Sequence, residues 1–126
     1  MNHDTELFGR IAGVLPTLEG WCDLEKANTL ASAVLSLRPA VTVEIGVFGG
    51  KSLIPMALAC AACGTGRVIG IDPWDAASST EGYTEANADW WKSVDHEAIY
   101  RGFTAHVHAL GIEPYVEVWR DRKSVV

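Results

Sequence analysis

Residues 41–52 read Val-Thr-Val-Glu-Ile-Gly-Val-Phe-Gly-Gly-Lys-Ser, and a second apolar run, Val68-Ile-Gly-Ile-Asp72, follows further along the chain. The first stretch is rich in β-branched residues up to Ile45, which predicts a short strand followed by a glycine turn and a helix. The second stretch predicts a neighbouring strand that ends at Asp72. Together they predict a βαβ unit with polar groups at the carboxyl ends of its strands, where open α/β sheets bind nucleotide-like ligands.

The flanking patterns extend this unit in both directions. Apolar residues between Leu7 and Leu18 recur at helical spacing and predict an N-terminal helix that ends near Pro16. A second helix is predicted to begin after Asp23 and to end at Arg38-Pro39. Residues 75–89 are small and polar, which indicates a lid-like loop. A helix that begins near Asp89 or Asp95 and ends at Leu110 precedes a strand over residues 115–119. The order α-α-β-α-β-α-β is typical of the first half of a doubly wound parallel sheet.

Bulk composition narrows the classes of protein. The 126 residues and 13.6 kDa suit one domain, and 48% hydrophobic residues are typical of a globular chain. A net charge of −6 argues against a nucleic-acid partner, which requires a basic face. The longest apolar run, residues 53–63, is too short to span a membrane, and residues 1–6 do not resemble a signal peptide. With three cysteines expected to be reduced, the sequence predicts a cytoplasmic protein without a membrane partner.

The glycine turn after Ile45 is compatible with three kinds of ligand site. A phosphate-binding P-loop requires four residues between its glycines, and Gly46 and Gly50 enclose only three. A dinucleotide fingerprint requires a second glycine where Phe48 stands, and a side chain there would block a pyrophosphate. Both interpretations are disfavoured by the spacing.

The third interpretation is a site for an amino acid joined to a nucleoside. The carboxylate of Glu44 would repel a phosphate but attract an ammonium group, and Ser52, at the start of a helix, offers a hydroxyl and an amide to a carboxylate. Glycines at 46 and 50 allow the backbone to approach a ligand closely. Asp72 could accept hydrogen bonds from two ribose hydroxyls. S-adenosylmethionine is a ligand of this description.

The pattern Glu44-x-Gly46-x-x-x-Gly50-x-Ser52, followed by Asp72 after an apolar strand, resembles the class I S-adenosylmethionine-dependent methyltransferases. Within them it is most similar to small-molecule O-methyltransferases such as the catechol and caffeoyl-coenzyme A enzymes. The resemblance implies S-adenosylmethionine-dependent methyl transfer to a small-molecule acceptor, expected at oxygen. It further implies cofactor roles for the following residues: Glu44 and Ser52 at the methionine end, Gly46 and Gly50 in the turn, Asp72 at the ribose, and Pro73 or Trp74 against the adenine.

The resemblance also predicts a Rossmann-like fold of which only part is present. Class I enzymes carry about seven strands in the order 3-2-1-4-5-7-6, and this chain is expected to supply the first three, in the order 3-2-1, with their flanking helices. Residues 1–126 would then form one partial, truncated domain, with N-terminal helices over 1–38 and a cofactor-binding βαβαβ half over 39–126. Strand one becomes an open edge, which predicts a homodimer formed through that edge or through helices.

The remaining cysteine, histidine and tryptophan motifs receive no functional assignment. Cys60 and Cys63 lack a second ligand pair, and His106 and His108 are two apart on a predicted helix, so no metal site is expected. His96 follows the predicted helix cap and is not nominated as a base, which leaves the catalytic residues unknown. Trp90-Trp91 would either line a substrate mouth or pack. Two other functions stay open: a non-catalytic remnant or binding fragment, and a P-loop-like nucleotide-binding protein.

Overall fold

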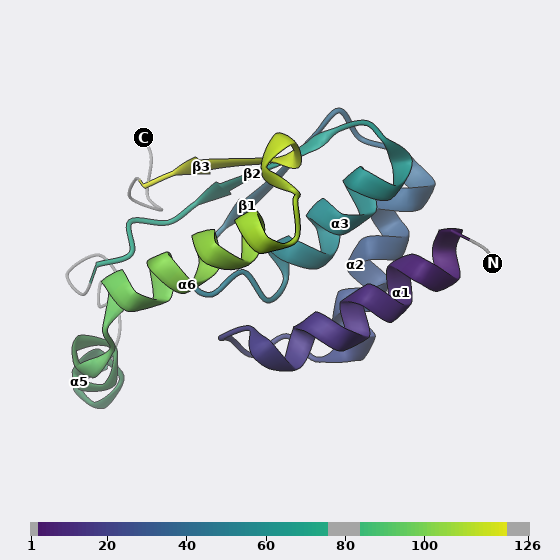
Figure 1. The fold of residues 1–126 in the computed structure, drawn as a ribbon. Helices are drawn as coiled ribbons and strands as arrows, with labels where there is room; N and C mark the ends of the chain where they lie inside the picture. Colours follow the sequence, from purple (N-terminus) through teal and green to yellow (C-terminus); the bar gives the residue numbers. More distant parts are fainter. Residues whose placement is uncertain (1–2, 76–83, 121–126) are drawn as a thin grey trace.

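A computed structural model describes residues 3–75 and 84–120 of the chain. They form an α/β fold in which three parallel strands make one sheet (Figure 1). The strands are β1 (Val41–Ile45), β2 (Arg67–Ile71) and β3 (Val116–Trp119). Their spatial order is β1-β2-β3, which is the predicted order 3-2-1 counted from the opposite edge. The three-stranded, Rossmann-like arrangement expected from the sequence is therefore confirmed.

Five α-helices and two 3₁₀ turns flank the sheet in the described part of the chain (Figure 1). They are α1 (His3–Val14), η1 (Leu15–Thr17), α2 (Leu24–Leu37), α3 (Leu53–Cys63), α5 (Glu85–Ser93), α6 (His96–Ala109) and η2 (Glu113–Tyr115). In Figure 1, α1 and α2, which pack on each other, lie at the end of the molecule opposite α5.

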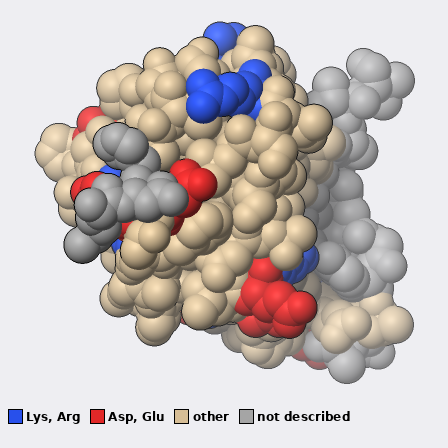
Figure 2. Space-filling view, turned by 90° about the vertical axis from the view of Figure 1, so that its right-hand side faces the viewer, with Lys and Arg blue, Asp and Glu red and all other residues tan. Residues whose placement is uncertain are grey.

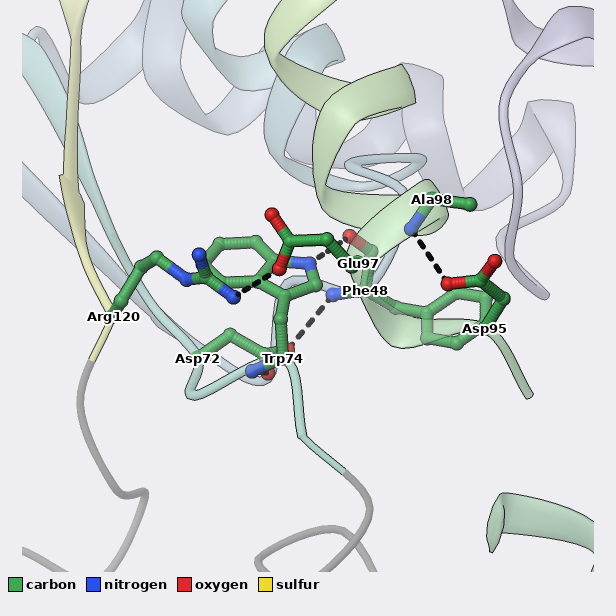
Figure 3. Close-up of polar contacts among 7 residues, drawn as sticks. All are labelled: Phe48, Asp72, Trp74, Asp95, Glu97, Ala98 and Arg120. Atoms are coloured by element: carbon green, nitrogen blue, oxygen red, sulfur yellow. Dashed lines mark hydrogen bonds and ion pairs between the residues drawn. The ribbon is translucent and has the colours of Figure 1, made fainter. Parts of the chain in front are cut away.

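Side-chain caps fix where two of these helices begin. The carboxylate of Asp23 accepts the amide of Lys26 at 2.8 Å before α2, and that of Asp95 accepts the amide of Ala98 at 3.0 Å before α6 (Figure 3). Of the two beginnings predicted for this helix, Asp95 is confirmed and Asp89 is wrong, because Asp89 lies inside α5. The predicted loop over 75–89 is wrong at its end, because α5 already begins at residue 85; residues 76–83 lie outside the described part.

Helix α3 is the apolar centre of the fold. Every residue from Leu53 to Cys60 is buried, and the helix packs on α1, α2 and β2. Ile11 of α1 belongs to the same buried cluster, and so does Phe103 of α6, which lies beside the glycine turn. Such a helix, apolar on all sides, requires cover on all sides. Its amino-terminal end lies beside the carboxyl end of β1, where Ser52 contacts Glu44.

One face of β1 is only partly covered, and one edge of this strand is unpaired within the described part of the chain. Val41, Val43 and Ile45 are 42, 54 and 60% exposed, and β1 pairs only with β2 among the described strands. The expected open edge at strand one is present in this part of the chain.

Charged residues do not form an extended basic surface on the face shown in Figure 2. Acidic and basic side chains occur there as small separate groups among uncharged residues. Over the described residues, no helix is both long and apolar enough to cross a membrane.

Candidate functional site

A pocket of about 330 Å³ opens at the carboxyl ends of β1 and β2. Its volume lies at the lower end of the range for small-molecule sites. Four segments line it: the loop before α2, the turn after β1, the end of β2, and the connection from α5 to α6. The residues that matter most for its chemistry are Trp21, Glu44, Phe48, Asp72, Trp91 and His96.

Asp72 holds the glycine turn against the end of β2. Asp72 is 6% exposed, and its Oδ2 atom accepts the backbone amide of Val47 at 2.8 Å. The same atom accepts the amide of Phe48 at 2.9 Å (Figure 3). Its Oδ1 atom accepts the amide of Trp74 at 2.9 Å. Because an ionised carboxylate offers about four acceptor positions, roughly one position on Oδ1 is left for a ligand.

Phe48 and Trp74 are strained residues joined to each other at this turn. Both have left-handed backbone conformations, with φ values of 52° and 50°, and side chains other than glycine occupy this region at a cost. The indole Nε1 of Trp74 donates to the carbonyl oxygen of Phe48 at 2.8 Å (Figure 3). Trp74 is only 3% exposed and packs between Tyr100 and Phe103. Its ring therefore builds the pocket wall more than it offers a free face to a ligand.

Glu44 is a pocket carboxylate that can accept further hydrogen bonds. The hydroxyl of Ser52 donates to its Oε1 atom, so the two residues predicted to act together do lie together. Its Oε2 atom is buried and lacks a hydrogen-bond partner among the described residues. Burial raises the pKa of Glu44, an effect that the Ser52 hydrogen bond and the charge of Lys26 oppose. A buried acceptor of this kind is costly unless a ligand supplies a donor.

The predicted glycines permit the turn that brings these groups together. Gly46 and Gly50 have φ values of 90° and 84°, a region that favours glycine. A Cβ atom added at Gly50 would lie 2.4 Å from Cδ1 of Phe103. Gly49, for which no role was predicted, is packed as closely as Gly50. A Cβ atom at Gly49 would lie 2.3 Å from the carbonyl oxygen of Glu19. The turn is therefore shaped by close packing as well as by backbone angles.

Sequence reasoning missed an aromatic cluster at the pocket mouth, which we define as Trp21, Phe48 and Trp91. The ring centroids lie 5.1 Å apart for Trp21 and Phe48, 5.9 Å for Trp21 and Trp91, and 5.6 Å for Phe48 and Trp91. Trp90 packs against the cluster from outside and is 48% exposed. Trp91 therefore lines the pocket, one of the two roles considered for the pair, and Trp90 lies at its rim.

The charged lining of the pocket has both signs. Lys26 and Lys51 line it together with Glu44 and Asp72. Cys22 also lines it; burial raises the pKa of its thiol, so it is not a nucleophilic thiolate at neutral pH. All three cysteines are free thiols, and no group of three or more metal-ligating side chains occurs within the described ranges.

The six predicted cofactor residues thus gather around the turn between β1 and α3 and the end of β2. Glu44, Gly46, Ser52, Asp72 and Trp74 line the pocket, and Gly50 packs behind it against Phe103. His96, which sequence reasoning set aside, lines it too. Only the fold brings His96 there, because its neighbours in the sequence belong to a helix cap and carry no ligand pattern.

Comparison with known families gives one match. A family profile described as a methyltransferase domain matches residues 43–122, which is well over half of the chain and includes both strand ends of the pocket. No curated protein matches the chain significantly.

Proposed function

The chain belongs to the methyltransferase-domain family, of the class I S-adenosylmethionine-dependent type, and from that premise we propose that its pocket binds S-adenosylmethionine for methyl transfer to an oxygen of a small molecule. The observation that carries the proposal is the buried Oε2 atom of Glu44, which lacks a partner among the described residues. The proposal concerns the ligand, the acceptor atom and the roles of individual residues.

The site suits an ammonium group at Glu44. An ammonium donates up to three hydrogen bonds, and its charge would offset the burial cost that raises the pKa of this carboxyl group. Lys26 already favours the ionised form, yet it forms no ion pair with Glu44 among the described residues. A charged donor from a ligand would therefore complete the site.

The carboxylate and the ribose of the ligand would bind on either side of Glu44. The hydroxyl of Ser52 is already donated to Glu44, so we assign the ligand carboxylate to the amino-terminal end of α3, where backbone amides and the helix dipole attract an anion. Asp72 has one acceptor position left on Oδ1, so we assign it a single ribose hydroxyl. Trp74 packs against Tyr100 and Phe103, so we assign only the edge of its ring to contact with the adenine.

When bound, S-adenosylmethionine supplies an electrophilic methyl group on a sulfonium. The residues of this chain contribute by position: Glu44 and the start of α3 hold one end of the ligand, and Asp72 holds the turn itself. When the methyl donor and the acceptor are held in line, their reaction becomes effectively unimolecular. This positioning accounts for much of the rate acceleration that an enzyme can give to methyl transfer. The chain thus provides the donor half of the apparatus.

Isothermal titration calorimetry with S-adenosylhomocysteine and with ATP tests the proposal. We expect saturable, micromolar binding of S-adenosylhomocysteine and none of ATP. Binding of ATP alone would support a nucleotide-binding protein instead, and binding of neither ligand would support a non-catalytic remnant of the fold.

A further inference from the structure

The turn beside Glu44 contains a strained residue that needs support from outside the turn. Phe48 and Trp74 both have left-handed backbone angles, and such conformations persist only where surrounding contacts prevent their relaxation. One such contact joins the two residues, because the indole Nε1 of Trp74 donates to the carbonyl oxygen of Phe48 at 2.8 Å. The position of the Trp74 ring is therefore coupled to the conformation of the turn.

Helix α6 holds the Trp74 ring through two aromatic residues. The ring of Phe103 stacks on it at a centroid distance of 5.7 Å, and the ring of Tyr100 meets it edge to face at 4.8 Å. Phe103 is fully buried, whereas Tyr100 is only partly buried. Tyr100 is thus the less restrained of the two, and a contact that fixes Tyr100 also restrains Trp74.

Arg120 makes that contact from the carboxyl end of β3. Its guanidinium carbon lies 4.1 Å from the centroid of the Tyr100 ring, a distance at which a cation is attracted to an aromatic face. Its Nη2 atom donates to Oε2 of Glu97 at 2.9 Å, and Figure 3 shows this side chain reaching from the strand to the start of α6. Glu97 and Tyr100 are three residues apart and therefore neighbours on the helix surface. Arg120 thus connects β3 to the first turns of α6.

The position of Arg120 allows its role to be separated from ligand contact and from global stability. Arg120 does not line the pocket, so it lies outside the set of residues that could contact the donor ligand directly. Its side chain is 39% exposed, and partly exposed ion pairs contribute little to the stability of a fold. Removal of the guanidinium should therefore leave the chain folded and alter mainly the groups that it touches.

We propose that Arg120 is a positioning residue for the donor site. By connecting β3 to the start of α6 it holds the Trp74 indole against the Phe48 carbonyl, and it thereby keeps the turn in the conformation that presents Glu44. The effect on ligand binding rests on the proposed function, whereas the restraint of Trp74 is a property of the chain without ligand.

Hydrogen exchange of the Trp74 indole, measured by NMR, tests the restraint directly. Trp74→Phe removes this indole and so identifies its signal. In Arg120→Gln we expect the Nε1 proton of Trp74 to exchange about three- to tenfold faster, the size expected for loss of a partly exposed cation–π contact and ion pair. The affinity for S-adenosylhomocysteine in calorimetry should fall by a similar factor, about three- to tenfold.

Two further variants distinguish positioning from a general effect of charge or stability. Arg67→Gln removes another half-exposed arginine in an ion pair, 3.6 Å from Glu117, at the opposite end of the sheet, and it should change neither measurement. Arg120→Lys retains a cation that can lie over Tyr100, so it should recover most of the exchange protection and most of the affinity.

Three results would overturn the inference: unchanged exchange of the Trp74 indole in Arg120→Gln, equal acceleration in Arg67→Gln, or faster exchange with an unchanged affinity for S-adenosylhomocysteine. Failure of the proposed function is distinguishable from these outcomes. If the unmodified chain does not bind S-adenosylhomocysteine, the donor assignment fails, and the exchange rates still decide whether Arg120 holds Trp74.

Discussion

At the scale of single residues, two carboxylates a few residues from the same turn have opposite roles. Asp72 accepts three backbone amides, which leaves it one acceptor position, and it stabilises the turn. Glu44 accepts from Ser52 and keeps one buried oxygen without a partner among the described residues. Sequence spacing identified both residues as ligand contacts and could not distinguish them. The difference arises because the chain turns back over Asp72, and this happens only in the folded state.

Substitution of Glu44 by Gln should separate ligand binding from stability. A charge-assisted hydrogen bond is worth about 1.5–3 kcal/mol, so affinity for S-adenosylhomocysteine should fall by roughly 10- to 150-fold in calorimetry. Glu25→Gln, an exposed change on α2, is the matched control and should leave affinity unchanged. An unaltered affinity in Glu44→Gln would remove the ammonium assignment.

Because the pKa of Glu44 is raised, Glu44→Gln should also change the stability of the fold, and this change should depend on pH. Because the folded chain holds this proton more tightly than the unfolded chain, the stability contributed by Glu44 is present below its unfolded pKa and is lost as pH rises through the folded value. At neutral pH, Glu44→Gln should therefore raise the melting temperature, and the gain should vanish in acid. A lower melting temperature at neutral pH would contradict the buried charge.

Substitution of Asp72 by Asn should instead destabilise the fold. Asn offers one acceptor oxygen in place of two, so at least one amide bond to a charged group is lost, at a cost of about 1.5–3 kcal/mol in urea denaturation. Asp89→Asn, on the exposed side of α5, should change the unfolding free energy by less than about 0.5 kcal/mol. Equal stability of the two variants would show that Asp72 does not hold the turn.

At the scale of elements, the turn between β1 and α3 is the feature that positions the site. It contains three residues with left-handed backbone angles, Gly46, Phe48 and Gly50, and it places the first residues of α3 beside Glu44. Phe103 of α6 fills the space that a side chain at position 50 would need. The packing of α6 and the shape of the ligand turn are therefore coupled.

Gly50→Ala should disrupt that coupling. The left-handed backbone angle and the 2.4 Å approach to Phe103 together should cost about 2–5 kcal/mol of unfolding free energy. Gly102→Ala, one residue from Phe103 on α6, has open space for its Cβ atom and should stabilise the helix by about 0.5–1 kcal/mol. If both variants were equally stable in urea denaturation, close packing at the turn would be excluded.

The elements themselves were largely predictable from the sequence. Short-range signals were sufficient for β1 and β2, whose β-branched runs end before Gly46 and Asp72, and for the caps at Asp23 and Asp95. Helix α5 was anticipated only in part, because residues 85–88 are small and polar and were expected to form a loop, whereas a helix from Asp89 was one of two alternatives. The contribution of His96 and Trp21 to the pocket depends on contacts between distant segments, which periodicity does not encode.

At the scale of the whole molecule, the exposed side of β1 is the least expected surface for a stable globular chain. Three apolar side chains are exposed along a strand that lacks a second partner among the described strands. Such edges favour pairing with another chain. We propose that two copies associate through β1.

Light scattering after size-exclusion chromatography tests this association. A dimer should elute at about twice 13.6 kDa, and Val43→Lys should convert it to a monomer with little change in melting temperature. Leu37→Lys, a similar change at a residue of α2 that is 76% exposed, should leave the dimer intact. A monomeric unmodified chain at high concentration would refute association through this strand, and a dimer disrupted only by Leu37→Lys would indicate a helical interface.

The turn after β1 is proposed to bind the amino-acid end of a sulfonium nucleoside. A crystal structure of the chain with S-adenosylhomocysteine would decide whether it does. We expect the ligand ammonium within hydrogen-bond distance of Glu44 Oε2, about 2.7–3.2 Å, and a ribose hydroxyl on Asp72 Oδ1. A ligand bound elsewhere, or a Glu44 side chain that remains without contact to the bound ligand, would contradict the account.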